Sequence, residues 1–467
     1  MAQQSVRHAT SVPERGSGIG VGLMGLGVVG SGVARILAER ASVYERRIGR
    51  PLQVRRILVR DRHRRREFDP APNLLTTEAA DLLGDPRIQV VVEVMGGEEP
   101  AYSYMRRALA SGRYVVTANK EVMAKHGPEL LALAQDQGVD ILYEASVGGG
   151  IPLIAPLKRD LIANEITSLR AILNGTTNYI LTRMSHDGLG FQAALGQAQA
   201  LGYAEADPTN DVEGIDAAYK LAILASLAFR TTVQPSDVAR EGITRLTAND
   251  FRYARELGYV IKLLAIAHHD AGHGVQVRVH PALLHAEEPL AKVDGVFNAV
   301  EMEGDLLGRV LFEGQGAGSM PTTSAVIADL IDLARTIANG PAGRSTWHHA
   351  AAGVIRPFSE LQSRYYLRLR VPDRAGVLSK VCGVLGDDHG ISISDIIQKE
   401  TSQADQTAEL VIMTHLARES DMQSALQQLE TLPAVSRVGN FLRVEAGRLT
   451  SAGDGSAPDG AVVLHGL

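Results

Sequence analysis

A glycine-rich hexapeptide at the junction of a predicted strand and a predicted helix constrains the fold of this chain most. Residues Gly25 to Gly30 read GLGVVG and lie between an apolar run, 19–24, and an amphipathic stretch, 29–39. At such a junction the first glycine permits a tight turn, and the second, Gly27, lets a pyrophosphate approach the backbone. The third glycine lets the helix pack closely on the strand. The motif therefore predicts a dinucleotide-binding domain of the Rossmann type.

Apolar strand patterns continue to alternate with helical patterns up to about residue 150, at 52–59, 88–94 and 113–118. This alternation is typical of an α/β domain with a doubly wound parallel sheet, in which ligands bind at the carboxyl ends of the strands. A later glycine-rich turn, GQGAG, also suggests close backbone approach to a cofactor or to a domain interface. The expected cofactor contacts are Gly25, Leu26, Gly27, Val28, Val29, Gly30, Arg60, Gly96, Thr117, Lys120, Gly316 and Gly318.

The end of the second predicted strand bears on the choice of cofactor. An acidic residue there would bind the ribose 2′-hydroxyl of NAD, whereas an arginine suits the 2′-phosphate of NADP. Here Arg60 comes first and Asp61 follows. The pair favours NADP and leaves NAD possible.

An acidic segment, 202–220, carries five carboxylates ahead of one lysine and leads into an apolar helix. Asp216 and Lys220 are four residues apart, so a helix places both on one face. Partial burial would lower the pKa of Lys220 toward a range useful for proton transfer. An isolated pair of this kind is more often a surface ion pair, but the nucleotide motif favours a catalytic reading with Lys220, Asp216 and Lys120 as the candidates.

A predicted helix start after Asn174 offers free backbone N–H groups that can hold a substrate carboxylate. Carboxylates of the acidic segment are the natural partners for an ammonium group, because a buried cation without a partner is costly. The expected substrate contacts are Glu205, Lys220, Asp211, Gly175, Thr176 and Tyr203. Together these features predict a dinucleotide-dependent enzyme that binds an amino acid.

Composition limits the other possibilities. The 467 residues carry a net charge of -6, which argues against a nucleic-acid partner, and they contain one cysteine, Cys382. Apolar runs stay shorter than the roughly 18 residues of a membrane span, and the N-terminus lacks a signal-peptide core. We therefore expect a cytoplasmic protein without a membrane partner.

Residues 363–445 have the pattern of a separate ferredoxin-like βαββαβ unit. The expected organisation is a flexible tail at 1–17, a dinucleotide-binding domain at 18–150, an α+β catalytic and dimerisation domain at 151–345, a linker at 346–362, the ferredoxin-like unit at 363–445 and a second flexible tail at 446–467.

The motifs GLGVVG, TANK, EASVGGGIP, LNGTTNYIL, GYAEADPTNDVEGIDAAYK and GQGAG, in this order, resemble homoserine dehydrogenase over about residues 18 to 440. The resemblance implies reduction of aspartate 4-semialdehyde to homoserine, on the route to threonine, methionine and isoleucine. It makes Lys220 the proton donor, Asp216 its orienting partner, Glu205 the ligand of the amino group, and Lys120 a contact to cofactor and substrate. It also implies a sodium site at Glu144, Val147, Gly149 and Ile151, a monofunctional enzyme, and a homodimer or homotetramer. One departure from the commoner family pattern is Ala206, where many relatives carry proline.

The sequence PDRAGVL within the last unit resembles the ligand loop of ACT regulatory domains. The resemblance implies an amino-acid effector, typically threonine, bound at Asp373, Gly376, Val377 and Leu378. Two other readings stay open at this point. One is an oxidoreductase acting on a different carbonyl compound, and the other is a catalytically silent amino-acid sensor.

Overall fold

A computed structural model describes residues 18–270, 272–340, 353–402 and 406–445. The two predicted tails, 1–17 and 446–467, and residues 346–352 of the predicted linker lie outside the described residues. In the described part, no helix is both long enough and apolar enough to span a bilayer.

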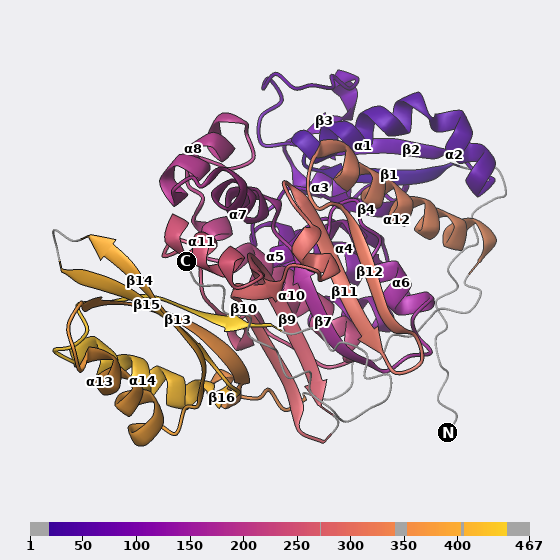
Figure 1. Cartoon of the computed structure of the whole chain (residues 1–467). Coiled ribbons are helices and arrows are strands. Elements are labelled where there is room, and N and C mark those ends of the chain that lie inside the picture. The colour runs from indigo at the N-terminus through magenta and orange to yellow at the C-terminus, as the bar shows by residue number, and fades with distance from the viewer. Residues whose placement is uncertain (1–17, 271, 341–352, 403–405, 446–467) are drawn as a thin grey trace.

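The first domain is a parallel sheet with the strand order β3-β2-β1-β4-β5-β6, which confirms the predicted doubly wound topology (Figure 1). Its strands are β1 (Ile19–Met24), β2 (Leu52–Leu58), β3 (Leu75–Thr76), β4 (Ile88–Glu93), β5 (Tyr114–Thr117) and β6 (Ile141–Leu142). Its helices are α1 (Val28–Glu39), α2 (Ala41–Ile48), α3 (Ala79–Leu83), α4 (Ala101–Ala110) and α5 (Lys120–Asp136). Val90 and Val92 pack in one apolar core and Val91 packs in another, as expected of a strand covered on both faces.

The second domain combines a mixed sheet with helices on one of its faces. The sheet has the strand order β12-β11-β7-β9-β10. Its strands are β7 (Ile166–Ile172), β9 (Tyr259–Asp270), β10 (Gly274–His285), β11 (Phe297–Gly304) and β12 (Gly308–Gln315), with the short β8 (Ala239–Arg240) beside β10. The helices are α6 (Ile154–Arg159), α7 (Gly175–Asp187), α8 (Phe191–Ala200), α9 (Thr209–Val212), α10 (Ile215–Ala228) and α11 (Ala248–Glu256). The α10 helix is apolar nearly all round and lies in the core between α5 and the sheet.

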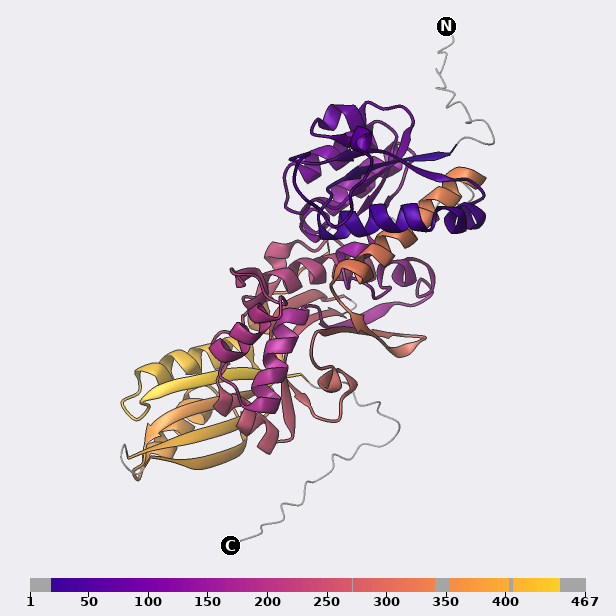
Figure 2. The ribbon, with the colours of Figure 1, turned by 90° about the horizontal axis from the view of Figure 1, so that it is seen from above.

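The C-terminal unit has the predicted βαββαβ order. It consists of β13 (Gln362–Pro372), α13 (Val377–Gly383), β14 (Ile393–Ser402), β15 (Thr407–Thr414), the short β16 (Ala417–Arg418), α14 (Glu419–Thr431) and β17 (Arg437–Val444). Its strands follow the order β17-β13-β15-β14, which is the ferredoxin-like arrangement. Figure 2 shows this unit at one end of the molecule and the first domain at the other.

The C-terminal unit is joined to the second domain edge to edge, a feature that the sequence did not reveal. Its strand β17 pairs in parallel with β10, Ala282 with Arg443 and Leu283 with Val444. The two sheets therefore form one continuous sheet whose ends are β12 and β14. The boundary is polar: Arg443, 1% exposed, donates to Glu241 of the second domain at 2.8 Å.

The helix that follows the second domain returns to the first. This helix, α12 (Ser319–Asn339), packs along α1 and places Val326 and Leu330 in the same apolar core as β1. Its buried carboxyl group Asp329 accepts a hydrogen bond from the backbone N–H of Glu144 at 2.9 Å. Burial, helped by the nearby Glu144 carboxylate, raises the pKa of Asp329 to about 8 against the opposing effect of that hydrogen bond.

Replacing Asp329 should change how stability depends on pH. Its folded-state pKa lies above the unfolded value of about 3.9, so its contribution is fully present below that value and is lost as pH rises through 8. Asp329→Asn keeps an acceptor for Glu144 but cannot ionise. We expect its free energy of unfolding, relative to wild type, to rise between pH 6 and pH 8 by up to about 1.4 kcal/mol per pH unit. Its thermal midpoint should rise with it.

The matched control is Asp136→Asn, an exposed carboxylate at the end of α5. It should leave the pH dependence of the thermal midpoint unchanged. If the thermal midpoints of Asp329→Asn and wild type differed by the same amount from pH 6 to pH 9, the pKa of Asp329 would not be raised.

Candidate active site

The carboxylate of Asp216 lies between two lysines that come from different domains. On α10, Lys220 donates from Nζ to Asp216 Oδ2 at 2.7 Å and to the Leu173 carbonyl oxygen at 2.7 Å. From the first domain, the Nζ of Lys120 makes an ion pair with Asp216 Oδ1. Because Lys120 is the first residue of α5, directly after β5, the pair forms at the carboxyl end of the parallel sheet. The structure thus brings together the three predicted catalytic residues.

The three groups have different access to solvent and different proton affinities. Asp216 is 3% exposed, and burial alone would raise its pKa, yet the attraction of Lys220 and Lys120 lowers it. Burial lowers the pKa of Lys220 more than Asp216 raises it. Burial alone would also lower the pKa of Lys120, but attraction by Asp216 raises it. Lys220 is therefore the lysine that can release its proton more readily.

Asn174 organises this cluster, a role that our sequence analysis did not assign. It is the N-cap of α7, where its Oδ1 accepts from the backbone N–H of Thr177 at 2.8 Å. Its Nδ2 donates to Asp211 at 2.6 Å and to Asp216 at 3.0 Å. One side chain thus fixes a helix start and two carboxylates. Its position directly before a predicted helix is the signal that could have identified it.

Asp211 is expected to interact with the substrate ammonium and lies beside the Asp216 cluster. Burial raises its pKa despite the hydrogen bond from Asn174. A cation close to Asp211 would favour its charged form, so the site is suited to a positively charged ligand group.

Three of the other predicted substrate residues, Gly175, Thr176 and Tyr203, lie at the start of α7. Thr176 donates from its hydroxyl to the Tyr203 carbonyl oxygen at 2.7 Å, and the Tyr203 ring lies 5.1 Å from that of Tyr179. Gly175 has no room for a side chain, since a Cβ there would lie 2.7 Å from the Val296 carbonyl oxygen. The side chain of Glu205 is exposed.

In the glycine-rich turn, one glycine has free space beside it and another has none, as a dinucleotide site requires. A Cβ at Gly30 would lie 2.2 Å from the Gly25 carbonyl oxygen, whereas nothing lies within 4 Å of one at Gly27. Helix α12 approaches the same turn, with the Ser319 hydroxyl donating to the Val28 carbonyl oxygen at 3.3 Å. The residues before α12 include Gly316 and Gly318, so both predicted glycine-rich segments lie at one site.

A second buried group that our sequence analysis missed is Glu93, at the end of β4. It is 0% exposed, accepts from the Thr117 hydroxyl at 2.6 Å and from the Met95 backbone N–H at 2.8 Å. Burial raises its pKa. Thr117, a predicted cofactor contact, is also fully buried, and its hydroxyl accepts from the backbone N–H of Asn119. The Thr117 side chain therefore holds the loops around Lys120 instead of presenting a free hydroxyl.

Residues 144–151, expected to bind a cation, form a turn against the GQGAG segment. The carboxylate of Glu144 accepts backbone N–H groups of Ile154 at 2.9 Å and Ala155 at 2.7 Å, and a third from Leu153. It therefore caps α6. The Gly150 N–H donates to the Gln315 carbonyl oxygen at 3.1 Å. Besides this carboxylate, the turn offers main-chain oxygen atoms as ligands for a cation.

Two predicted sites stand apart from this cluster. Arg60 is exposed at the end of β2, where Asp61 accepts from the His63 backbone N–H at 2.8 Å. The expected effector loop, 373–378, follows the end of β13 that is remote from β10. In that loop Asp373 accepts from the Gln398 amide at 3.2 Å, and Gly376 has a φ of 87°, which favours glycine.

Comparison with known protein families agrees with this architecture. A family model described as homoserine dehydrogenase matches residues 152–331, and one described as the homoserine dehydrogenase NAD-binding domain matches 25–144. A model for the ACT domain matches residues 365–434. The matched ranges correspond to the second domain, the first domain and the C-terminal unit.

Individual relatives extend over nearly the whole chain. A homoserine dehydrogenase of Bacillus subtilis (strain 168) is 42% identical over 427 residues, which cover 91% of this chain and 98% of the relative. The crystal structure of a homoserine dehydrogenase from Thiobacillus denitrificans has a TM-score of 0.85 at 43% identity, covering 92% of this chain and 99% of that chain. A hyperthermophilic archaeal homoserine dehydrogenase in complex with NADPH has a TM-score of 0.57 at 29% identity. The match covers 68% of this chain and 97% of that chain. With its nucleotide turn, its Asp216 cluster and its C-terminal ACT domain, the chain belongs to the homoserine dehydrogenase family.

Proposed function

We propose that this chain reduces L-aspartate 4-semialdehyde to L-homoserine, in the biosynthesis of threonine, methionine and isoleucine. The observation that carries the proposal is the Asp216 carboxylate between Lys120 and Lys220, at the carboxyl end of a dinucleotide-binding sheet. Aldehyde reduction needs a hydride, a proton and a means to stabilise charge that develops on the carbonyl oxygen. A bound nicotinamide cofactor supplies the hydride, and the protein supplies the rest.

Lys220 is the residue best suited to give the proton. Its ammonium group is held by Asp216 and by the Leu173 carbonyl oxygen, so two of its three N–H bonds are fixed and one remains for the substrate. Burial lowers its pKa, which makes proton release easier than from an exposed lysine. As the carbonyl carbon accepts hydride, the oxygen takes the lysine proton and the aldehyde becomes an alcohol.

The remaining groups match the two charged ends of an amino-acid substrate. The substrate carboxylate can bind at the start of α7, at Gly175 and Thr176, because free backbone N–H groups at a helix start favour anions. Asp211 and Glu205 supply negative charge for the ammonium group, and Tyr203 packs beside Thr176. This arrangement favours an amino-acid aldehyde over an uncharged carbonyl compound.

Lys220→Met should lower turnover by about two to four orders of magnitude, because it removes the general acid and keeps a side chain of similar length. The measurement is the initial rate of NADPH oxidation with aspartate 4-semialdehyde. Cofactor binding, followed by fluorescence, should be retained. Lys292→Met, at an exposed lysine paired with Glu287, is the control and should keep wild-type turnover.

The pH profile gives this prediction a second readout. Donation requires protonated Lys220, so the wild-type rate of reduction should fall as pH rises through a value below the ordinary lysine pKa of 10.5. The residual rate of Lys220→Met should not show this fall with rising pH. Turnover in Lys220→Met close to that of wild type would remove Lys220 as the donor, and a wild type inactive with both NADPH and NADH would favour a catalytically silent sensor.

We further infer that NADP(H) is the preferred cofactor. Arg60 lies exposed at the end of β2, where a 2′-phosphate would be recognised, and the Asp61 carboxylate is engaged with the His63 backbone. The NADPH bound to the archaeal relative supports the same choice.

Arg60→Ala should raise the KM for NADPH roughly tenfold or more, since a hydrogen bond to a charged group contributes about 1.5–3 kcal/mol. The KM for NADH serves as the internal control and should change little. Equal losses with both cofactors would assign Arg60 to the stability of the turn instead of to recognition of the phosphate.

A monovalent cation, sodium in the first instance, is proposed for the turn 144–151. The Glu144 carboxylate accepts three backbone N–H groups, of which Oε2 takes one, so Oε2 keeps a lone pair for a cation. Main-chain oxygens of Val147, Gly149 and Ile151 would complete the ligand set. A cation here would stabilise the contact between this turn and the GQGAG segment, and hence the cofactor site.

Regulation by threonine through the ACT domain is also proposed, at Asp373, Gly376, Val377 and Leu378. The open turn before α13 offers backbone amides and the Asp373 carboxylate, which suit a zwitterionic ligand. Deleting the domain would be a poor test, because β17 covers the edge of β10 and Arg443 pairs with Glu241.

A point substitution is the better test. Asp373→Ala should raise the threonine concentration for half-inhibition about tenfold or more, because it removes a charged partner of the ligand. The control is Asp421→Ala, at an exposed residue of α14 in the same domain. Inhibition that is equally strong in Asp373→Ala and wild type would place the effector elsewhere.

A further inference from the structure

Two arginines lie side by side on the ACT sheet. Arg370 of β13 and Arg437 of β17 are direct cross-strand partners, and both are exposed. Like charges directly opposite each other destabilise a pair of strands. Among the described residues neither arginine has a carboxylate within ion-pair distance. The fold therefore keeps an unfavourable pair at this position.

Both arginines line a cavity at the boundary between the ACT domain and the second domain. The cavity has a volume of about 320 Å3 and is lined by Thr247, Ala248, Asn249, Arg368, Arg370, Glu409, Arg437 and Gly439. Thr247, Arg437 and Gly439 also line a wider groove of about 1280 Å3, to which Arg240 and Arg245 contribute from the second domain.

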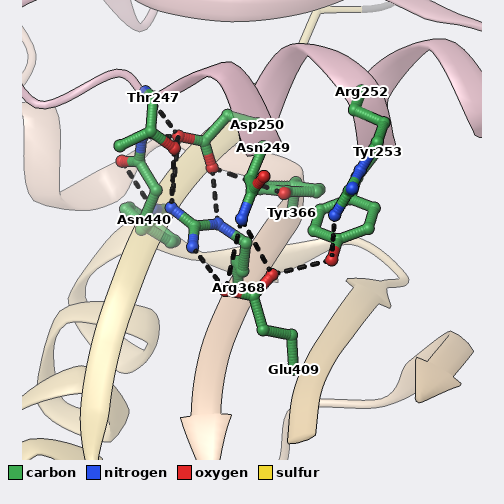
Figure 3. Close-up of polar contacts among 10 residues, drawn as sticks. Thr247, Asn249, Asp250, Arg252, Tyr253, Tyr366, Arg368, Glu409 and Asn440 are labelled. Carbon is green, nitrogen blue, oxygen red and sulfur yellow. Dashed lines mark hydrogen bonds and ion pairs between the residues drawn. The ribbon is translucent and has the colours of Figure 1, made fainter. Parts of the chain in front are cut away.

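The two carboxylates at the smaller cavity, Glu409 and the neighbouring Asp250, are already engaged. Figure 3 shows Arg368 between Asp250 of α11, at 2.8 Å, and Glu409 of β15, at 3.2 Å. Glu409 is also in register with Arg370, but its second oxygen accepts from the Tyr253 hydroxyl at 2.7 Å. The negative charge of Asp250 and Glu409 is therefore used by Arg368 and its neighbours, and among the described residues Arg370 and Arg437 form no ion pair.

We propose that Arg370 and Arg437 bind a small anion, bearing a carboxylate or a phosphate group, at this domain boundary. Guanidinium groups bind either group through paired N–H donors, and the anion would relieve the repulsion between the two side chains. A volume of 320 Å3 lies at the small end of ligand pockets.

The bound anion would contact both domains. Thr247 lines the cavity, and it is the N-cap of α11, where its hydroxyl and N–H both hold Asp250 at 2.8 Å. The site is distinct from the 373–378 loop, and it does not depend on the reaction that the enzyme catalyses.

The test is isothermal titration of the full chain with inorganic phosphate and, separately, with succinate. Ionic strength is held constant with NaCl, and saturating NADPH occupies the first domain. Wild type should bind at least one probe saturably. Arg370→Gln and Arg437→Gln should each weaken that binding about tenfold or more. Arg107→Gln, at an exposed arginine of α4, should leave it unchanged.

The two probes identify the group that is recognised. Binding of phosphate alone assigns a phosphate-bearing ligand, and binding of succinate alone assigns a carboxylate. Absence of saturable binding by either probe would overturn the proposal, as would unchanged affinity in both glutamine variants.

Thermal unfolding without ligand gives an independent check. Removing one of two repelling charges should raise the thermal midpoint of the ligand-free protein, and the further rise caused by the probe should disappear. A lower midpoint in both variants, with the rise caused by the probe retained, would show that the arginines are structural and would overturn the site.

Discussion

The Asp216 carboxylate is the constraint on which the rest of the active site depends. It is buried on α10 of the second domain and faces one lysine of its own helix and one from the first domain. A buried carboxylate that lost either partner would retain much of its desolvation cost, so the two domains are held in the arrangement that completes the pair. The same contacts set the proton affinities: Asp216 stays ionised, and Lys220, the more deeply buried lysine, has the lowered pKa.

The connection of the domains reinforces this arrangement. The chain leaves the first domain after β6, builds the second domain, and returns through α12, whose first turn touches the Val28 carbonyl oxygen and whose Asp329 holds the Glu144 backbone. The nucleotide turn, the turn at 144–151 and the GQGAG segment therefore meet through short backbone contacts, where a Cβ at Gly149 would lie 2.6 Å from the Gly316 carbonyl oxygen. Such close packing explains why glycines occur on both sides of the contact.

Much of this could be read from the sequence, because it depends on local patterns. The turn at 25–30, the spacing of Asp216 and Lys220, and the βαββαβ order of the last unit each arise from residues close together in the chain. Contacts between distant segments were not predictable in the same way. Glu93 looks like the polar end of an apolar strand, and only the fold shows it buried against Thr117. Asn174 reads as a turn residue, yet its amide reaches carboxylates 37 and 42 positions later.

The continuous sheet between the second domain and the ACT domain also depends on contacts between distant segments, and it restrains the movement of the ACT domain. Pairing of β17 with β10 depends on two edges that are about 160 residues apart, and no local pattern marks it. At that edge Arg278 donates to Glu445 at 2.8 Å, and Arg443 is shared by Glu241 and Glu419. Buried ion pairs are sensitive to geometry, because each charge has lost its hydration and depends on its partner. An ACT domain joined in this way cannot swing on its linker without breaking them, so an effector would act by shifting strands and charged pairs that the second domain shares, and not by releasing a tethered module.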